Sequence, residues 1–178
     1  MTENLQTTIS PFIADDIASH VRDLGALLHA CVHDGASIGF VLPFTVGDGE
    51  SFWDDSVLPA VRDGTRVLLV ARVSGRIAGT VQLDYDTMPN QRHRAEVRKL
   101  LVHPDARRRG IARALMIDLE RIARHLGRSL LTLDTRTGDR AEHLYASLGY
   151  KTAGVIPGFC RDTTGDRLDA TTIMYKAL

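Results

Sequence analysis

The chain has 178 residues, which suits one domain with a sizeable core, and its 44% hydrophobic and 25% charged content is ordinary for a soluble protein. Its 22 basic and 22 acidic residues cancel, which argues against a general attraction to nucleic acid or to an anionic membrane. No apolar stretch approaches the roughly 20 residues of a membrane-spanning helix and no signal peptide opens the chain, so we expect a cytoplasmic protein. Cys31 and Cys160 lie far apart without a metal-type spacing, which favours two free thiols.

The first third of the chain predicts a short strand and two helices ahead of the main sheet. Residues 7–12 are the expected strand. From Asp15 to His33, apolar residues recur at the spacing that places them on one helical face, and a second helix is expected from Glu50 to Arg62. The segment GASIGF at 35–40 interrupts the helical pattern, and a loop with a proline and two glycines follows at 42–49.

The rest of the chain predicts the strands of a sheet. Residues 66–73 and 76–85 are rich in aliphatic residues and flank the turn Ser74-Gly75, which indicates a hairpin. The remaining elements are expected to be strands at 95–102, 130–135, 150–156 and 171–175, and helices from 111 to about 126 and from 140 to 148. No internal repeat or linker divides them, so residues 1–178 are expected to form a single mixed α/β domain.

One stretch, AEVRKLLVHPDARRRGIARALMIDLE from Ala95 to Glu120, carries the strongest functional signal. Its strand ends at His103-Pro104, because proline cannot donate to a strand ladder. A basic turn of three arginines and Gly110 follows, and an amphipathic helix begins at once with Ile111. This order directs backbone N–H groups and the positive end of a helix dipole at one point. The stretch therefore predicts a site for a phosphate or a pyrophosphate.

The pattern Arg107-x-x-Gly110-x-Ala112 after this strand resembles the acyl-CoA-binding motif of the GNAT superfamily of N-acetyltransferases, Gln/Arg-x-x-Gly-x-Gly/Ala. The order of the predicted elements is similar to that of the superfamily over nearly the whole chain. The resemblance implies an α/β fold of the α+β type, with a mixed, mostly antiparallel sheet of about six to seven strands flanked by about four helices. Within the superfamily, LLTLDT, GYKTAGVIPGF and GASIGF look most similar to the tabtoxin-resistance acetyltransferases.

The resemblance also implies a binding site for acetyl-CoA. Backbone groups of Leu101 and Val102 are expected to pair with the pantetheine arm, as another strand would. The pyrophosphate is expected to be held mainly by backbone N–H groups of Arg107, Arg108, Arg109, Gly110, Ile111 and Ala112. A side chain at Gly110 would block either a close approach or the required backbone angle. Each arginine side chain either meets the 3′-phosphate or is solvated.

Three side chains are candidates for acyl transfer, which needs a base for the amine and a proton for the departing thiolate. Tyr145 occupies the position of the superfamily's general acid, and the alternative is a tyrosine packed against the sheet. Glu96 on the central strand is the expected base, unless it is paired with Arg94 or Arg98. Asp134 is a second carboxylate that orients the substrate ammonium group or shares the base role, and the alternative is that it caps the following turn.

Together these residues predict an acetyl-CoA-dependent N-acetyltransferase that acts on an amine of a small molecule by direct attack in a ternary complex. The narrower resemblance implies detoxification of a toxin or antibiotic. The alternatives are an enzyme for protein or peptide amines and a non-enzymatic acyl-CoA-binding module, against which the presence of Tyr145 with Glu96 argues. The histidines show no ligand spacing with cysteines or carboxylates, so no metal is expected. We expect neither a nucleic-acid nor a membrane partner, and a homodimer stays open because dimers are frequent among relatives.

Overall fold

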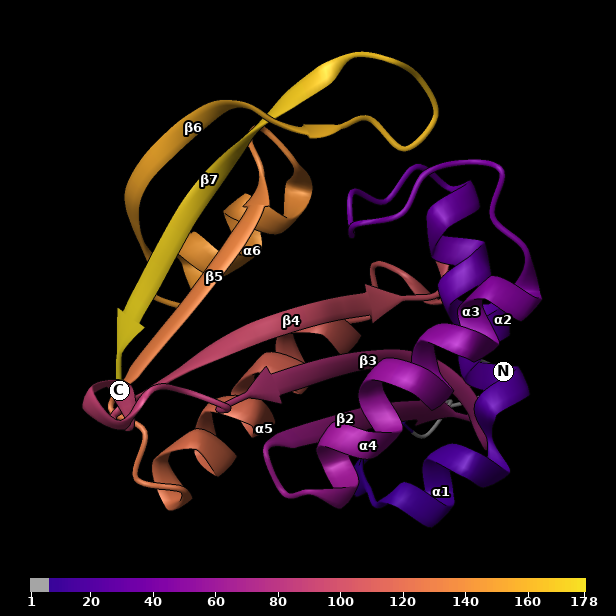
Figure 1. The fold of residues 1–178 in the computed structure, drawn as a ribbon, viewed down its shortest axis with the longest axis horizontal. Coiled ribbons are helices and arrows are strands. Elements are labelled where there is room, and N and C mark those ends of the chain that lie inside the picture. The colour runs from indigo at the N-terminus through magenta and orange to yellow at the C-terminus, as the bar shows by residue number, and fades with distance from the viewer. Residues whose placement is uncertain (1–6) are drawn as a thin grey trace, which may run out of the picture.

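A computed structural model describes residues 7–178, which contain one seven-stranded sheet (Figure 1). The order of strands across the sheet is β1-β2-β3-β4-β5-β7-β6. The strands are β1 (Thr7–Phe12), β2 (Arg66–Val73), β3 (Arg76–Asp84), β4 (Arg94–Val102), β5 (Leu130–Arg136), β6 (Lys151–Arg161) and β7 (Leu168–Ala177). Every neighbouring pair is antiparallel except β4 with β5, which is parallel. This mixed, mostly antiparallel sheet confirms the predicted fold class.

Helices cover both faces of the sheet. The α-helices are α1 (Ala14–Ser19), α2 (Val21–His33), α3 (Val46–Phe52), α4 (Leu58–Arg62), α5 (Ile111–His125) and α6 (Arg140–Ser147), with short 3₁₀ turns at Pro89–Gln91 and Pro104–Ala106. Residues of α5 and α6 share one hydrophobic core, and residues of α1, α2 and α4 share the other. Within residues 7–178, no helix is long and apolar enough to cross a membrane.

The two cores follow from the pleat of the strands, because successive residues of a strand point to opposite faces of a sheet. On β2, Leu69 belongs to the core beneath α5, whereas the preceding Leu68 belongs to the core beneath α2. Leu115 of α5 and Leu28 of α2 are fully buried against these two faces. Burial contributes about 1.5–3 kcal/mol for each such leucine. The central strands are thus fixed from both sides.

The first predicted helix, Asp15–His33, is interrupted at His20, so the prediction of one continuous helix was wrong there. His20 separates α1 from α2 with a φ of −120° and a ψ of 16°, which are not helical. Its imidazole Nδ1 hydrogen-bonds the carbonyl oxygen of Asp16 at 2.8 Å, and Arg72 donates to its Nε2 at 3.1 Å. These contacts hold the ring against β2. They are tertiary contacts, so the apolar periodicity of the sequence could not predict the break.

The second predicted helix, Glu50–Arg62, begins earlier than expected. Helix α3 follows Thr45, whose side chain accepts a hydrogen bond from the backbone N–H of Asp48 at 3.1 Å. The carboxylate of Asp48 accepts a bond from the backbone N–H of Thr45 at 2.7 Å in return. This reciprocal capping box can be recognised in the sequence, and the predicted start at Glu50 did not take it into account.

A π-helical turn at Trp53–Val57 joins α3 to α4. Pro59 lies just beyond it and has no N–H with which to bond the preceding turn, so the regular ladder is lost there. Trp53 itself is fully buried in the core beneath α2. Packing therefore accounts for this tryptophan.

The C-terminal hairpin is longer than the strands predicted at 150–156 and 171–175. Strand β6 continues to Arg161, and β7 begins already at Leu168. The ladder shifts its register around Pro157, which cannot donate to it, and pairing resumes beyond. An irregularity of this kind is tolerated because β6 is an edge strand. The extension brings the hairpin loop toward the place where β4 and β5 diverge (Figure 1).

Candidate active site

The sheet opens between its two parallel strands, β4 and β5 (Figure 1). They pair only from Arg94 to Glu96 on β4, opposite Leu130 to Thr132 on β5. Beyond Glu96 they diverge and line a cleft of 1810 Å³. One edge of β4 therefore has no strand partner along the cleft. The predicted pantetheine-binding residues lie on this stretch and line the cleft: Leu101 and Val102.

An irregularity at Lys99 accompanies the opening. Its φ of 49° is left-handed, and the register between β3 and β4 shifts by one residue at this point. An extra residue on one strand bends that strand and increases its twist, which suits the divergence of β4 from β5. The Lys99 ammonium group donates to the carbonyl oxygen of Ile38 at 2.7 Å. Burial lowers the pKa of Lys99, and the charge of Arg98 lowers it further.

The basic turn ends at the N-terminus of α5 and faces the cleft. Gly110 is the N-cap residue with a φ of 79°, and no side chain caps the helix. The first N–H groups of α5 are therefore available to a ligand. A Cβ atom on Gly110 would meet nothing within 4 Å, so its left-handed backbone, not steric crowding by the protein, requires glycine. Among the predicted loop residues, Arg107, Arg108, Gly110, Ile111 and Ala112 line the cleft, whereas Arg109 does not.

Arg107 ties the basic turn to the rest of the protein. Its guanidinium forms an ion pair with Asp34 at the end of α2 and donates to the carbonyl oxygen of Val102 at 3.3 Å. The thiol of Cys31 also donates to that carbonyl at 3.5 Å. Burial raises the pKa of Cys31 to about 11, although Arg107 acts in the opposite direction. These contacts identify Arg107 as a residue that positions the turn.

Tyr145 lies on α6 and reaches the cleft from the side of β5. Asp139 begins this helix by accepting a hydrogen bond from the N–H of Arg140 at 2.6 Å. The tyrosine is 6% exposed and lines the cleft, with its ring centroid 5.8 Å from that of Tyr150. Burial raises the pKa of Tyr145, and the charges of Asp134 and Asp139 raise it further. The tyrosine is thus packed in the core and also borders the cleft. The sequence had presented a general acid and a tyrosine packed against the sheet as alternatives, and this position is compatible with both.

The two candidate carboxylates lie on the strands that border the opening. Glu96 is the last β4 residue paired with β5, and its Oε1 lies 3.7 Å from Nε of Arg98. Asp134 lies on β5, and its Oδ2 accepts a hydrogen bond from the hydroxyl of Thr171 at 3.1 Å. Both residues line the cleft. The structure therefore brings Glu96, Asp134 and Tyr145 to one space, and Glu96 also has the arginine partner that the sequence allowed.

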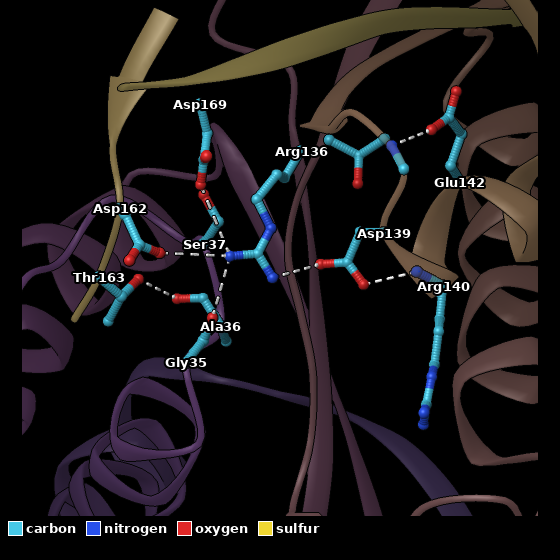
Figure 2. A network of polar contacts seen from close by, with 12 residues as sticks. Gly35, Ala36, Ser37, Arg136, Asp139, Arg140, Glu142, Asp162, Thr163 and Asp169 are labelled. Atoms are coloured by element: carbon cyan, nitrogen blue, oxygen red, sulfur yellow. Dashed lines mark hydrogen bonds and ion pairs between the residues drawn. The ribbon is translucent and has the colours of Figure 1, made fainter. Parts of the chain in front are cut away.

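Arg136 at the end of β5 was missed by the sequence analysis, and Figure 2 shows it at the centre of a polar network. Its guanidinium lies 3.2 Å from Asp139, 3.7 Å from Asp162 and 3.8 Å from Asp169. It also donates to the carbonyl oxygen of Gly35 at 3.4 Å. An arginine at a strand end is usually solvated, so no local pattern distinguishes this one.

The same network connects the segment 35–39 to the loop between β6 and β7 (Figure 2). The hydroxyl of Thr163 donates to the carbonyl oxygen of Ala36 at 2.9 Å, and the N–H of Leu42 donates to the Thr163 carbonyl at 2.9 Å. We call these two connected loops the strap. Residues of both loops line the cleft, and the first loop follows directly on Asp34, the partner of Arg107. In the part of the chain that the structure describes, no group of three or more His, Cys, Asp or Glu side chains is placed to hold a metal ion.

Comparison with known proteins agrees with this geometry. Residues 40–150 match the model of the Acetyltransferase (GNAT) family. The chain is 34% identical over 125 residues to an uncharacterized N-acetyltransferase from the hisH-hisA intergenic region of Azospirillum brasilense, which covers 68% of this chain and 71% of the relative.

Solved structures show the same fold at low sequence identity. A putative acetyltransferase from Acinetobacter baylyi has a TM-score of 0.83 at 15% identity and covers 100% of this chain and 95% of its own. YncA, a putative acetyltransferase from Salmonella typhimurium with its cofactor acetyl-CoA, has a TM-score of 0.75 at 18% identity and covers 97% and 94%. The family model and the Azospirillum relative together show that the chain belongs to the GNAT family of acetyltransferases.

Proposed function

We propose that the protein transfers the acetyl group of acetyl-CoA to a primary amine of a small molecule by direct attack. One observation carries the proposal: a single cleft joins an unpaired strand edge and an uncapped helix N-terminus to Glu96, Asp134 and Tyr145. The strand edge and the helix suit the donor, and the three side chains suit acid–base chemistry at its acyl end. Because donor and acceptor meet in one cleft, the reaction needs no covalent intermediate on the protein.

The residues of the donor half fit acetyl-CoA, whose thioester supplies an activated acetyl group when it is bound. The open edge of β4 offers backbone N–H and C=O groups to the amides of a pantetheine arm, as in strand addition. The free N–H groups at the start of α5 suit the pyrophosphate. Arg108 lines the cleft beside them and suits the 3′-phosphate.

The two carboxylates act on the acceptor amine, which must lose a proton before it can attack. The amine arrives as an ammonium group because a simple alkyl amine has a pKa of about 10. Glu96 lies where the strands separate, so it is placed to accept that proton directly or through a water molecule. Asp134 faces the same space from β5 and attracts the ammonium group. Glu96 is therefore the base, and Asp134 orients the amine.

Tyr145 is the hydrogen-bond donor to the departing thiolate sulfur. Its raised pKa keeps the hydroxyl protonated at neutral pH, so it donates a hydrogen bond to the developing thiolate. A thiol has an ordinary pKa of about 8.5, so complete transfer of the phenolic proton is uphill, mainly because burial raises the pKa of Tyr145 and further because of the charge of Asp134. An ammonium group beside Asp134 lowers the pKa of Tyr145. Binding of the acceptor thus prepares the proton donor.

The strap favours a compact acceptor. Its hydrogen bonds join the segment 35–39 to the β6–β7 loop beside the cleft, and an extended peptide would compete with them for space. Detoxification of an amine-bearing toxin or antibiotic, as in the tabtoxin-resistance acetyltransferases, is consistent with such an acceptor. A protein or peptide amine remains the second candidate, and it requires the strap to open.

Two measurements on the purified protein test the proposal. Acetyl-CoA and CoA should each raise the thermal stability while NAD does not, since a ligand at a hundredfold excess over its dissociation constant contributes about 2.7 kcal/mol. Acetyl-CoA with a panel of small amines should release free thiol in an amine-dependent manner. Absence of both effects would overturn the proposal. Mass spectrometry of a lysate incubated with the enzyme and labelled acetyl-CoA would reveal a protein acceptor instead.

A further inference from the structure

A second, smaller pocket of 240 Å³ opens beside the cleft, and the acid–base chemistry proposed above does not use it. It is lined by Phe52, Ser56, Arg66, Gln82, Arg98 and Lys99. Arg98 and Lys99 also line the main cleft, so the two spaces adjoin at these side chains. Half of the lining residues are cations and none is a carboxylate. We call this space the cationic pocket.

The register of the sheet explains where the cationic pocket lies. Arg66 on β2 is opposite Asp84 on β3, which in turn is opposite Glu96 on β4. In the next row on the same face, Gln82 is opposite Arg98. Residues two apart on a strand are separated by roughly 7 Å. The cationic pocket thus begins one row away from the proposed base.

The three cations that line the cationic pocket outnumber the two carboxylates that pair with them, Asp84 and Glu96. Asp84 compensates two of the cations, with its Oδ2 2.6 Å from Arg66 and 3.1 Å from Arg98. The ammonium group of Lys99 bonds the neutral carbonyl of Ile38, and no carboxylate among residues 7–178 lies within salt-bridge distance of it. Burial and then the charge of Arg98 lower the pKa of Lys99, while the charges of Asp134 and Glu96 raise it, and an anion in the pocket would offset the repulsion from Arg98.

Two hydrogen-bond donors of the cationic pocket are buried without a partner, Nε2 of Gln82 and Nε of Arg66. Gln82 is only 1% exposed. Its Oε1 accepts a bond from Arg66 at 3.4 Å, so the amide orientation leaves the NH₂ group as the free end. Buried donors in proteins almost always have an acceptor. Buried donors without a protein acceptor, beside three cations, suit an anionic acceptor.

We propose that the cationic pocket binds a carboxylate of the acceptor, so that the substrates are amino-acid-like molecules that carry both a primary amine and a carboxylate. This inference rests on the proposed acetyltransferase function and names its substrate class. Arg98 and Lys99 contact the carboxylate from the side of the cleft, and Gln82 donates its amide N–H from the floor. Phe52 forms an apolar wall that keeps water from the bound group. With the carboxylate held there, the amine of the substrate extends toward Glu96.

Matched pairs of acids and carboxamides test this assignment. Acetylation is measured for glycine and glycinamide, β-alanine and β-alaninamide, and L-lysine and L-lysinamide, which vary the distance between amine and carboxylate. The acid of at least one pair should have the higher kcat/KM by about tenfold, the effect of a hydrogen bond to a charged group. The carboxamide has the less basic amine and hence the chemical advantage, so a preference for the acid reports binding. Equal or better use of the carboxamide in every pair overturns the assignment and leaves the acetyltransferase function intact.

Substitutions locate the preference in the cationic pocket. Gln82→Met and Arg98→Gln should each bring the ratio of acid to carboxamide kcat/KM toward one. Gln82→Met removes the unpaired donor and a long bond from Arg66, which keeps Ser56 and Asp84 as partners, so the variant should keep its fold, as a thermal melt would show. The control is Arg76→Gln, an exposed arginine at the opposite end of β3, which should leave the ratio unchanged. An unchanged ratio in both pocket variants contradicts the assignment.

A binding measurement separates this inference from the proposed function. Calorimetric titration of the CoA-saturated protein with N-acetylglycine and with N-acetylglycinamide probes the cationic pocket without turnover. Binding of the acid alone supports the pocket even where no amine is acetylated, and the failure then concerns only the proposed reaction. Binding of both with equal affinity, or of neither, overturns the carboxylate assignment.

Discussion

The two halves of the cleft are built in different ways. The donor half comes from one continuous stretch, β4 through α5, and presents mainly backbone groups: an unpaired strand edge and the first N–H groups of a helix. The acceptor half is assembled from side chains on many separate segments, which include the 35–39 loop, α3, β2 and β3, β5, α6 and the β6–β7 hairpin as well as β4 itself. The donor site thus depends on local chain geometry, whereas the acceptor site depends on how distant segments pack.

The largest effect is expected where the halves meet, at Tyr145. Tyr145→Phe removes the hydroxyl that serves the departing sulfur and should lower kcat by about 10²–10⁴-fold, the usual contribution of acid–base catalysis. The KM for acetyl-CoA and the thermal stability should stay close to those of the wild type, because the ring keeps its place in the core. Steady-state kinetics by thiol release provide the measurement. A variant with unchanged kcat would show that the sulfur leaves without this residue.

Glu96→Gln should have the next largest effect, because it removes the base and keeps the shape of the side chain. We expect kcat/KM to fall by about 10²-fold, with partial recovery at high pH, where more of the acceptor is already deprotonated. The matched control is Asp134→Asn on the opposing strand, which should mainly raise the KM of the acceptor. If Asp134→Asn causes the larger loss and the pH dependence, the roles of the two carboxylates are exchanged.

Arg136→Gln examines the acceptor half alone. The substitution removes the cation shared by Asp139, Asp162 and Asp169, and we expect it to lower the free energy of unfolding by about 1–3 kcal/mol. The strap loses its anchor to β5, so kcat/KM for the acceptor should fall about tenfold while the KM for acetyl-CoA is unchanged. Chemical denaturation and kinetics with each substrate varied would measure both effects.

The control for Arg136 is Arg161→Gln in the same hairpin. Arg161 pairs with Asp166 at 2.6 Å, but both side chains are more than half exposed. An exposed pair of this kind contributes less than about 1 kcal/mol. Equal destabilisation by both substitutions would show that the Arg136 network is no more than a surface ion pair.

The donor half could be predicted from the sequence because its signals are contiguous. Pro104 ends a strand, Gly110 permits a left-handed residue and the apolar periodicity of α5 begins directly after it, so three local rules agree. The structure places all but one of the predicted donor residues along the cleft; the exception is Arg109. The strands of the central sheet were predicted for the same reason, since alternation and turn residues are local properties.

The acceptor half could not be predicted in this way. Arg136 and Gln82 have no local pattern that separates them from a solvated arginine and an ordinary strand residue, and their partners are as far away in sequence as Gly35 and Arg66. The break at His20 has the same origin, because Arg72 on another element holds the imidazole. Such features depend on tertiary packing, which one sequence without its fold does not reveal.

Gly110→Ala examines the donor half with a smaller expected effect. Its left-handed conformation costs a residue with a side chain about 1–2 kcal/mol, and relaxation of the loop should raise the KM for acetyl-CoA several-fold. The control is Gly64→Ala, in the exposed turn before β2, with a φ of 68° and an equally open Cβ position. Both variants should lose similar stability, but only Gly110→Ala should weaken binding of acetyl-CoA. Unchanged binding in Gly110→Ala would mean that the loop geometry does not hold the donor.

The smallest effect concerns the two thiols, Cys31 on α2 beside the donor half and Cys160 in the acceptor half, and chemical labelling measures it. Cys31 is 1% exposed and its pKa is raised to about 11, mainly by burial, so only about one molecule in a thousand carries a thiolate at pH 8. Cys160 is partly exposed, with its sulfur 3.6 Å from the hydroxyl of Ser37 on the strap. Iodoacetamide should therefore modify Cys160 and spare Cys31, as peptide mapping would show. The labelling of Cys31 should increase only as the pH approaches 11, and rapid labelling at pH 8 would mean that the contact of α2 with β4 opens readily in solution.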